Sequence, residues 1–249
     1  MNNKTTKLFV ILGGFFICNA LLAEFIGVKI FSLEACFGAE SLANNVNWPL
    51  PGFNLTAGVL LWPFVFILTD IINEYFGKKG VRFLSFLTVG LIAYAFLMVN
   101  MAILLVPADF WIGGYPAVAN MQLAYKAVFG QGLWIIIGSI VAFLIGQLLD
   151  VIVFHRIKMI TGERFLWLRA TGSTLVSQFV DSFVVLYIAF YLSGVFTLEM
   201  VLQIGLVNYI YKFVVAVVLT PLLYIIHKWI DTYLGEKLAH KLMAHAKNN

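Results

Sequence analysis

The sequence predicts an all-α polytopic membrane protein with six transmembrane helices and both termini in the cytoplasm. Two observations lead to this prediction. The 249 residues are 62% hydrophobic and only 11% charged, with a mean hydropathy of +0.95, whereas about a quarter of the residues in a soluble domain are charged. The apolar residues also gather in runs that reach the ~20 residues needed to cross a ~30 Å hydrocarbon core.

The expected helices, taken in order along the chain, cover residues 8–30, 55–76, 83–106, 133–154, 174–195 and 201–227. No segment between them has the composition of a soluble domain, so we expect one transmembrane domain over residues 1–249. Most of the 16 Lys and Arg residues lie before the first helix, in the second and fourth connections, and in the tail. Because positive residues are retained in the cytoplasm, this pattern predicts that both termini are cytoplasmic.

Residues 68–77, LTDIINEYFG, close the second expected helix and carry three polar side chains. Asp70, Asn73 and Glu74 are spaced i, i+3 and i+4, so on a helix they share one face. Carboxylates and amides inside a membrane span are costly unless they face a cavity, a partner or water. The stripe is therefore a candidate functional feature.

The helical rise of ~1.5 Å per residue converts sequence distance from a basic anchor into membrane depth. Asp70 precedes Lys78 by eight positions, which corresponds to about 12 Å. The same arithmetic brings five polar groups from four helices close to the midplane, and a central polar layer of this kind is typical of a transporter substrate site. These five groups are Asn19, Asp70, Gln147, Gln178 and Asp181.

A second layer is expected roughly 24–26 Å from the cytoplasmic side. It contains Glu24 on the first helix and Lys212 on the sixth, which form a candidate buried ion pair because their charges are opposite and their depths equal. Asn208 lies one turn above Lys212 on the same face.

Several of these groups also have a structural interpretation. Glu74 and Asp150 lie near the cytoplasmic edge, where they could neutralise nearby basic residues. Asn19 and Gln147 could hydrogen-bond between helices. For Asp70, Asp181 and Lys212 we favour a functional role, because a charged side chain this deep in the membrane is costly and is usually kept for function.

The connection between the third and fourth helices contains a possible short helix around residues 118–129. It could lie on the outer leaflet as an amphipathic helix, or it could form a lid over an outward-open cavity.

Three stretches together resemble the queuosine-precursor transporter family, also called the VUT family. They are residues 62–82 (WPFVFILTDIINEYFGKKGVR), 146–158 (GQLLDVIVFHRIK) and 167–181 (WLRATGSTLVSQFVD). The resemblance implies a bacterial inner-membrane protein that imports 7-cyano-7-deazaguanine, 7-aminomethyl-7-deazaguanine or queuine for tRNA modification. It leaves open the energy source, a homo-oligomer and an energising partner.

A 7-deazaguanine would suit the polar layer chemically. Its N–H and exocyclic amine could donate together to the carboxylate of Asp70 or Asp181. Its carbonyl oxygen needs a donor, for which Asn73, Gln147, Gln178 and Lys212 are available. The candidate substrate-binding residues are Asn19, Asp70, Asn73, Glu74, Gln147, Asp150, Gln178, Asp181, Asn208 and Lys212.

Two other functions are alternatives. One is the substrate-binding subunit of an ATP-driven vitamin importer, although the first helix lacks the Ala-x-x-x-Ala pattern of those subunits. The other is an intramembrane hydrolase, in which Asp150 and Asp181 would form an aspartyl dyad. Neither of these aspartates has the Gly-x-Gly-Asp context, and no histidine lies at membrane depth to activate a serine. We therefore expect a non-enzyme with no catalytic residue, no metal site and no cofactor, whose partners are the small-molecule substrate and the lipid bilayer rather than nucleic acid.

Overall fold

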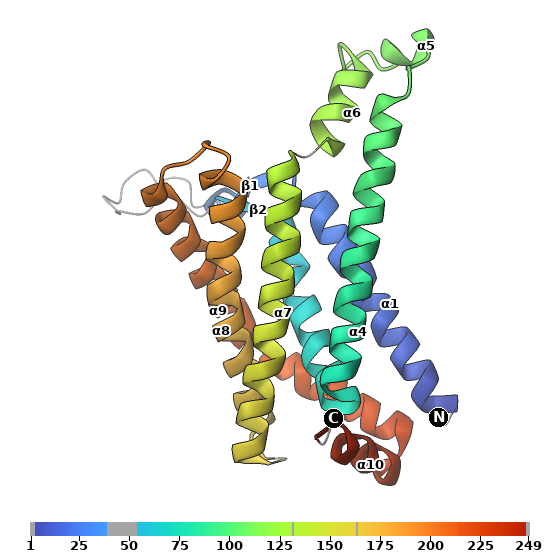
Figure 1. Ribbon diagram of the computed structural model, residues 1–249, viewed down its shortest axis with the longest axis vertical. Coiled ribbons are helices and arrows are strands. Elements are labelled where there is room, and N and C mark those ends of the chain that lie inside the picture. The colour runs from blue at the N-terminus through green and yellow to red at the C-terminus, as the bar shows by residue number, and fades with distance from the viewer. Residues whose placement is uncertain (1–2, 39–53, 131, 163, 248–249) are drawn as a thin grey trace.

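The computed structural model describes residues 3–38, 54–130, 132–162 and 164–247, which form an elongated helical bundle (Figure 1). Within the described residues, five helices are long and apolar enough to cross a membrane. They are α1 (Asn3–Ile26), α4 (Trp62–Leu104), α7 (Leu133–Thr161), α8 (Leu166–Leu186) and α9 (Leu198–Leu234). The protein is therefore an all-α, multi-pass membrane protein.

The count of five differs from the expected six because the second and third expected helices both lie within α4. Gly77 interrupts this element with a non-helical backbone, φ 70° and ψ −173°, and Figure 1 shows the chain reversing direction there. The link expected at residues 77–82 is thus a single-residue bend between helical arms 62–76 and 78–104. A Cβ atom at position 77 would lie 2.8 Å from the carbonyl oxygen of Ala246, so both the positive φ and the close approach favour glycine.

The predicted end of the first helix and the predicted start of the second helix were wrong. Helix α1 ends at Ile26. Ile30 from the first expected helix, and Leu55 and Thr56 from the second, lie in a short antiparallel pair of strands, β1 (Ile30–Ser32) and β2 (Asn54–Thr56). A 3₁₀ turn, η1 (Ala57–Leu60), then leads into α4. Apolar composition alone cannot separate a short strand from a helix end, which explains the error.

The fourth and fifth helices extend further towards each other than expected. Helix α7 continues to Thr161, and α8 begins at Leu166 rather than near residue 174. Lys158 and Arg169, counted above among the basic residues of a connection, therefore lie on helices, and both side chains are buried. Directly after α8, a π-helical turn, η2 (Tyr187–Tyr191), extends the helix.

The carboxyl-terminal tail forms a helix that was not predicted, α10 (Glu236–Lys247). It buries Ala239, Met243 and Ala246, spaced i, i+4 and i+7, against the bundle. Figure 1 places α10 at the same end of the bundle as the start of α1. Helix α10 therefore covers the bend at Gly77.

At the opposite end, the described residues form three short helices, α2 (Leu33–Cys36), α5 (Asp109–Ile112) and α6 (Met121–Phe129). Helix α6 corresponds to the short helix expected around residues 118–129. Asn120 caps it by accepting a hydrogen bond from the Leu123 N–H, and Gln122 donates to the Ile103 carbonyl of α4. None of its residues is buried.

The core lies where α1, the first arm of α4 and α7 meet. Phe16 is fully buried there with its ring 6.2 Å from that of Phe143, and Trp62 contacts Phe143 from the other side. Large apolar side chains such as Phe83, Tyr94 and Val218 point outward and stay exposed, which is the pattern that a hydrocarbon environment favours.

Candidate functional site

A cavity lies between the first arm of α4, the first half of α8 and the middle of α9. Each helix contributes one face, because the lining residues recur every three or four positions. Its polar lining residues are Asp70, Thr171, Thr174, Gln178, Lys212 and Thr220. The cavity encloses about 480 Å³ of space free of protein atoms, part of it open to the surroundings.

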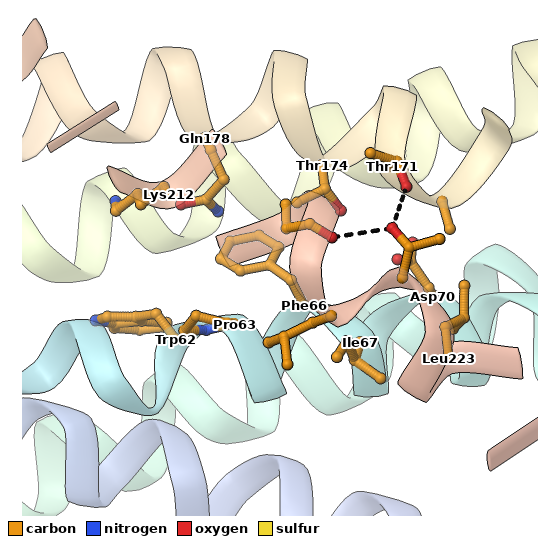
Figure 2. A pocket seen from close by; sticks show the side chains of 14 residues that line it. Trp62, Pro63, Phe66, Ile67, Asp70, Thr171, Thr174, Gln178, Lys212 and Leu223 are labelled. Atoms are coloured by element: carbon orange, nitrogen blue, oxygen red, sulfur yellow. Dashed lines mark hydrogen bonds between the residues drawn. The ribbon is translucent and has the colours of Figure 1, made fainter. Parts of the chain in front are cut away.

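The cavity is polar at both ends and aromatic between them. Figure 2 shows Lys212 and Gln178 together towards one end and Asp70 with Thr171 towards the other. Trp62 and Phe66, one helical turn apart on α4, line the space alongside them. A flat ligand with polar groups at its two edges would match this arrangement.

Asp70 is the acidic residue that lines this cavity, and it is 5% exposed. Its Oδ1 atom is buried and has no hydrogen-bond partner in the protein. The Thr174 hydroxyl lies beside the carboxylate, and Asp150, Glu74 and Arg169 act on it electrostatically. Because a buried carboxylate oxygen without a partner is costly, Asp70 is poised to accept a hydrogen bond from a bound ligand.

Gln178 and Lys212 supply donors at the other end. The Gln178 Nε2 group is buried without a hydrogen-bond partner. Lys212 forms an ion pair with Asp181, with 2.5 Å between Nζ and Oδ2. Asp181 does not line the cavity; it is the counter-charge of a lysine that does.

Glu24, the predicted partner of Lys212, accepts a hydrogen bond from Ser139 of α7. The Asp181 carboxylate also acts on Glu24 electrostatically. Asp181 thus lies between the two predicted partners, a role that depth alone did not assign to it. A direct Glu24–Lys212 pair stays a prediction.

Glu74 is one turn from Asp70 but has a different environment. It accepts two hydrogen bonds from Arg169, at 3.2 Å from Nε and 2.9 Å from Nη2, and its Oε2 lies 3.1 Å from Lys158 Nζ. Arg169 Nη1 donates in addition to the carbonyls of Gly162 and Arg164. Glu74 does not line the cavity, and its pairing with basic residues matches the structural interpretation.

Asn73, Gln147 and Asp150 are fully buried and do not line the cavity. Gln147 accepts from Thr69, and Asp150 accepts from Ser177. Buried atoms without hydrogen-bond partners nevertheless remain on all three: both amide atoms of Asn73, Nε2 of Gln147 and Oδ2 of Asp150. This unsatisfied polar layer lies on α4 and α7, next to Asp70.

Asn19 and Asn208, the remaining candidates, do not line the cavity. Asn19 donates to the Phe15 carbonyl of its own helix, and Asn208 is partly exposed on α9.

The sequence argument missed the threonines of the site. Thr171 and Thr220 share a hydrogen bond of 3.0 Å across the cavity wall, and Thr220 also donates to the Ala216 carbonyl (Figure 2). A threonine in an apolar helix usually bonds its own backbone, so sequence alone gives little signal. No group of three or more His, Cys, Asp or Glu in the described part of the chain could hold a metal ion.

Comparison with known proteins supports the resemblance seen in the sequence. Residues 56–226 match the family model described as "Putative vitamin uptake transporter", and this range includes every residue that lines the cavity. A Bacillus subtilis (strain 168) protein named "Probable queuosine precursor transporter" is 33% identical over 183 residues, covering 72% of this chain and 74% of the relative.

Two further relatives are similar to this chain. A Haemophilus influenzae protein with the same name is 32% identical over 67% of this chain and 66% of its own length. The Escherichia coli (strain K12) protein named "Queuosine precursor transporter" is 30% identical over 67% of this chain and 70% of its own length. No solved structure matches the chain significantly.

The fold and the cavity define a multi-pass helical membrane protein with a polar pocket between its helices. The chain belongs to the queuosine-precursor transporter (VUT) family, as the resemblance of its three polar stretches predicted.

Proposed function

We propose that this protein is an inner-membrane transporter that imports a queuosine precursor for tRNA modification. The substrate is 7-cyano-7-deazaguanine, 7-aminomethyl-7-deazaguanine or queuine. The observation that carries the proposal is the cavity between α4, α8 and α9, where Asp70 presents an unpartnered carboxylate oxygen. Membership of a family whose curated relatives are named queuosine precursor transporters supports the same substrate class.

The cavity offers complementary groups for a 7-deazaguanine. The N–H and amine of the guanine-like edge donate to Asp70, and the carbonyl oxygen accepts from Gln178 Nε2 or Lys212. Trp62 and Phe66 contact the faces of the flat ring. Because these polar side chains are largely buried, a ligand that lacks the matching edge leaves them unpaired and binds much more weakly.

We also propose that the chain crosses the membrane six times as one transmembrane domain over residues 1–249, with both termini in the cytoplasm. The reversal of α4 at Gly77 supports two crossings by this element. The position of α10 beside the start of α1 supports a common side for the two ends. The names of the relatives support transport without catalysis.

The test uses bacterial cells that can neither synthesise queuosine precursors nor import them through their own transporter. Expression of this protein should restore queuosine in tRNA when a single 7-deazaguanine is supplied, and labelled substrate should accumulate. Adenine, which lacks the guanine-like edge, serves as a competitor that should not block uptake at equal concentration. Absence of uptake for all three precursors, with the protein present in the membrane, would overturn the proposal.

A further inference from the structure

The region next to the substrate cavity carries two buried carboxylates, one on α4 and one on α7. Asp70 on α4 and Asp150 on α7 interact electrostatically, and the Thr174 hydroxyl of α8 lies beside both. Asp70 is 5% exposed and Asp150 is fully buried. Two adjacent carboxylates at this depth repel each other, so both ionise together only at a large cost.

Each of these carboxylates has an oxygen that the protein does not satisfy. Asp70 Oδ1 and Asp150 Oδ2 are buried without hydrogen-bond partners. Asn73, one turn from Asp70, leaves its amide oxygen and nitrogen unpartnered as well. Unpartnered oxygens this deeply buried indicate that the site receives a ligand, because buried polar groups in proteins are otherwise almost always paired.

The charges around the pair do not balance. Glu74 of α4 is neutralised by Arg169 of α8 and Lys158 of α7. Lys212 of α9 lines the cavity but is paired with Asp181 of α8. His155 of α7 interacts electrostatically with Lys78, Lys158 and Glu74.

Counting histidine as neutral, the buried carboxylates Asp70, Asp150 and Glu74 share two buried cations, Arg169 and Lys158, whereas Lys78 is only partly buried and is not counted. One negative charge remains. A single monovalent cation would neutralise the cluster.

We propose that Asp70 and Asp150 bind one monovalent cation, a proton or Na⁺, whose transport is coupled to that of the substrate. This inference rests on the proposed function. Asp70 belongs to both sites, since it lines the cavity and interacts with Asp150. A cation held at Asp150 leaves Asp70 negative and free to accept the N–H groups of the substrate.

The coupling acts in both directions, because a cation that tightens substrate binding must itself be bound more tightly by the substrate complex. A proton would reside on Asp150 in the substrate complex, so that Asp70 stays ionised. A sodium ion would additionally use hydroxyl oxygens, and Ser173, Thr174 and Ser177 of α8 all lie beside Asp150.

The experiment uses the purified full-length protein in liposomes, with the membrane potential clamped and with labelled 7-cyano-7-deazaguanine, 7-aminomethyl-7-deazaguanine and queuine each used in turn as the probe. Uptake is measured under an inward proton gradient, under an inward Na⁺ gradient and with no gradient. We expect one of the two gradients to drive accumulation above equilibrium, by about 5-fold or more. The proton arm and the Na⁺ arm distinguish the two cations.

One variant and one control test whether the cation binds at Asp150. Asp150→Asn should lose the response, so that the ratio of uptake with and without the gradient falls to one. Asp231→Asn is the matched control, because Asp231 is a carboxylate on α9 that accepts from Tyr75 and lies outside the cavity. It should keep the full response.

Substrate binding to the wild-type protein in detergent supplies a readout that does not depend on variant folding. The apparent Kd should change at least about 5-fold with pH or with Na⁺ concentration. Wild-type transport that is equal in all three arms, or a response that survives in Asp150→Asn, would overturn the inference. Absence of wild-type uptake of every precursor in every arm would instead overturn the proposed function.

Discussion

Two clusters of buried charge lie one helical turn apart on α4, and they differ in how well the protein satisfies them. Around Glu74, both carboxylate oxygens are bonded by cations that come from α7 and α8. Around Asp70, the nearest charges include another carboxylate, and one oxygen has no partner. The spacing of the sequence motif places both residues on one face of the helix. The fold makes Glu74 a structural brace and leaves Asp70 available for a ligand.

The difference between the Glu74 and Asp70 clusters predicts that Arg169→Met has the largest effect, a loss of folded protein. This change removes the bidentate partner of Glu74 and leaves a buried carboxylate undercompensated, which costs about 3–5 kcal/mol of folding free energy. We expect loss of folded protein from the membrane, measured by quantitative immunoblotting and by thermal unfolding in detergent. Arg164→Met is the control, because the Arg164 side chain is exposed. A normal amount of stable Arg169→Met protein would contradict the assignment of a brace.

The second-largest effect, a loss of precursor uptake, is expected for Asp70→Asn. Because Asp70 Oδ1 has no partner to lose, the variant should fold and reach the membrane in normal amounts. It loses the charged acceptor for the substrate, which is worth about 1.5–3 kcal/mol, so precursor uptake should fall by tenfold or more. Asp109→Asn, an exposed carboxylate between α4 and α6, should transport normally. Wild-type uptake by Asp70→Asn would remove Asp70 from the site.

A third prediction concerns the ion pair at the other end of the cavity. Asp181→Asn and Lys212→Gln should each lower the thermal unfolding midpoint, and the double variant should be milder than their sum, with a coupling of about 0.5–3 kcal/mol. The same cycle for Glu24→Gln with Lys212→Gln should show weaker coupling. Stronger coupling for Glu24 than for Asp181 would restore the pair expected from depth alone.

The smallest effect is expected for Thr220→Val, which keeps the shape of the side chain and removes the hydrogen bond to Thr171. The loss should be about 0.5–1.5 kcal/mol, visible as a small shift of the unfolding midpoint. Thr171→Val removes the same bond, so the double variant should be hardly less stable than either single variant. Fully additive losses would show that the two hydroxyls act separately.

Part of the site could be predicted from the sequence. Asp70, Gln178 and Lys212 were placed in the membrane interior by the distance to basic residues, and all three line the cavity. Arg169 shows the limit of that argument. The expected helix bounds place it in the fourth connection, at the membrane edge, yet it is 2% exposed and bonded to Glu74, because a basic residue with a buried acidic partner need not reach water.

The sequence by itself determined the class of protein and the family, because composition, run length and three polar stretches carry that information locally. It also predicted an approximate depth for each polar group, since the rise per residue of a helix is constant. Only the tertiary structure decided which groups meet. Glu74 and Arg169 are 95 positions apart, and the rotation of each helix about its axis, which the packing of its neighbours sets, brings them into contact while leaving Asp70 unpartnered.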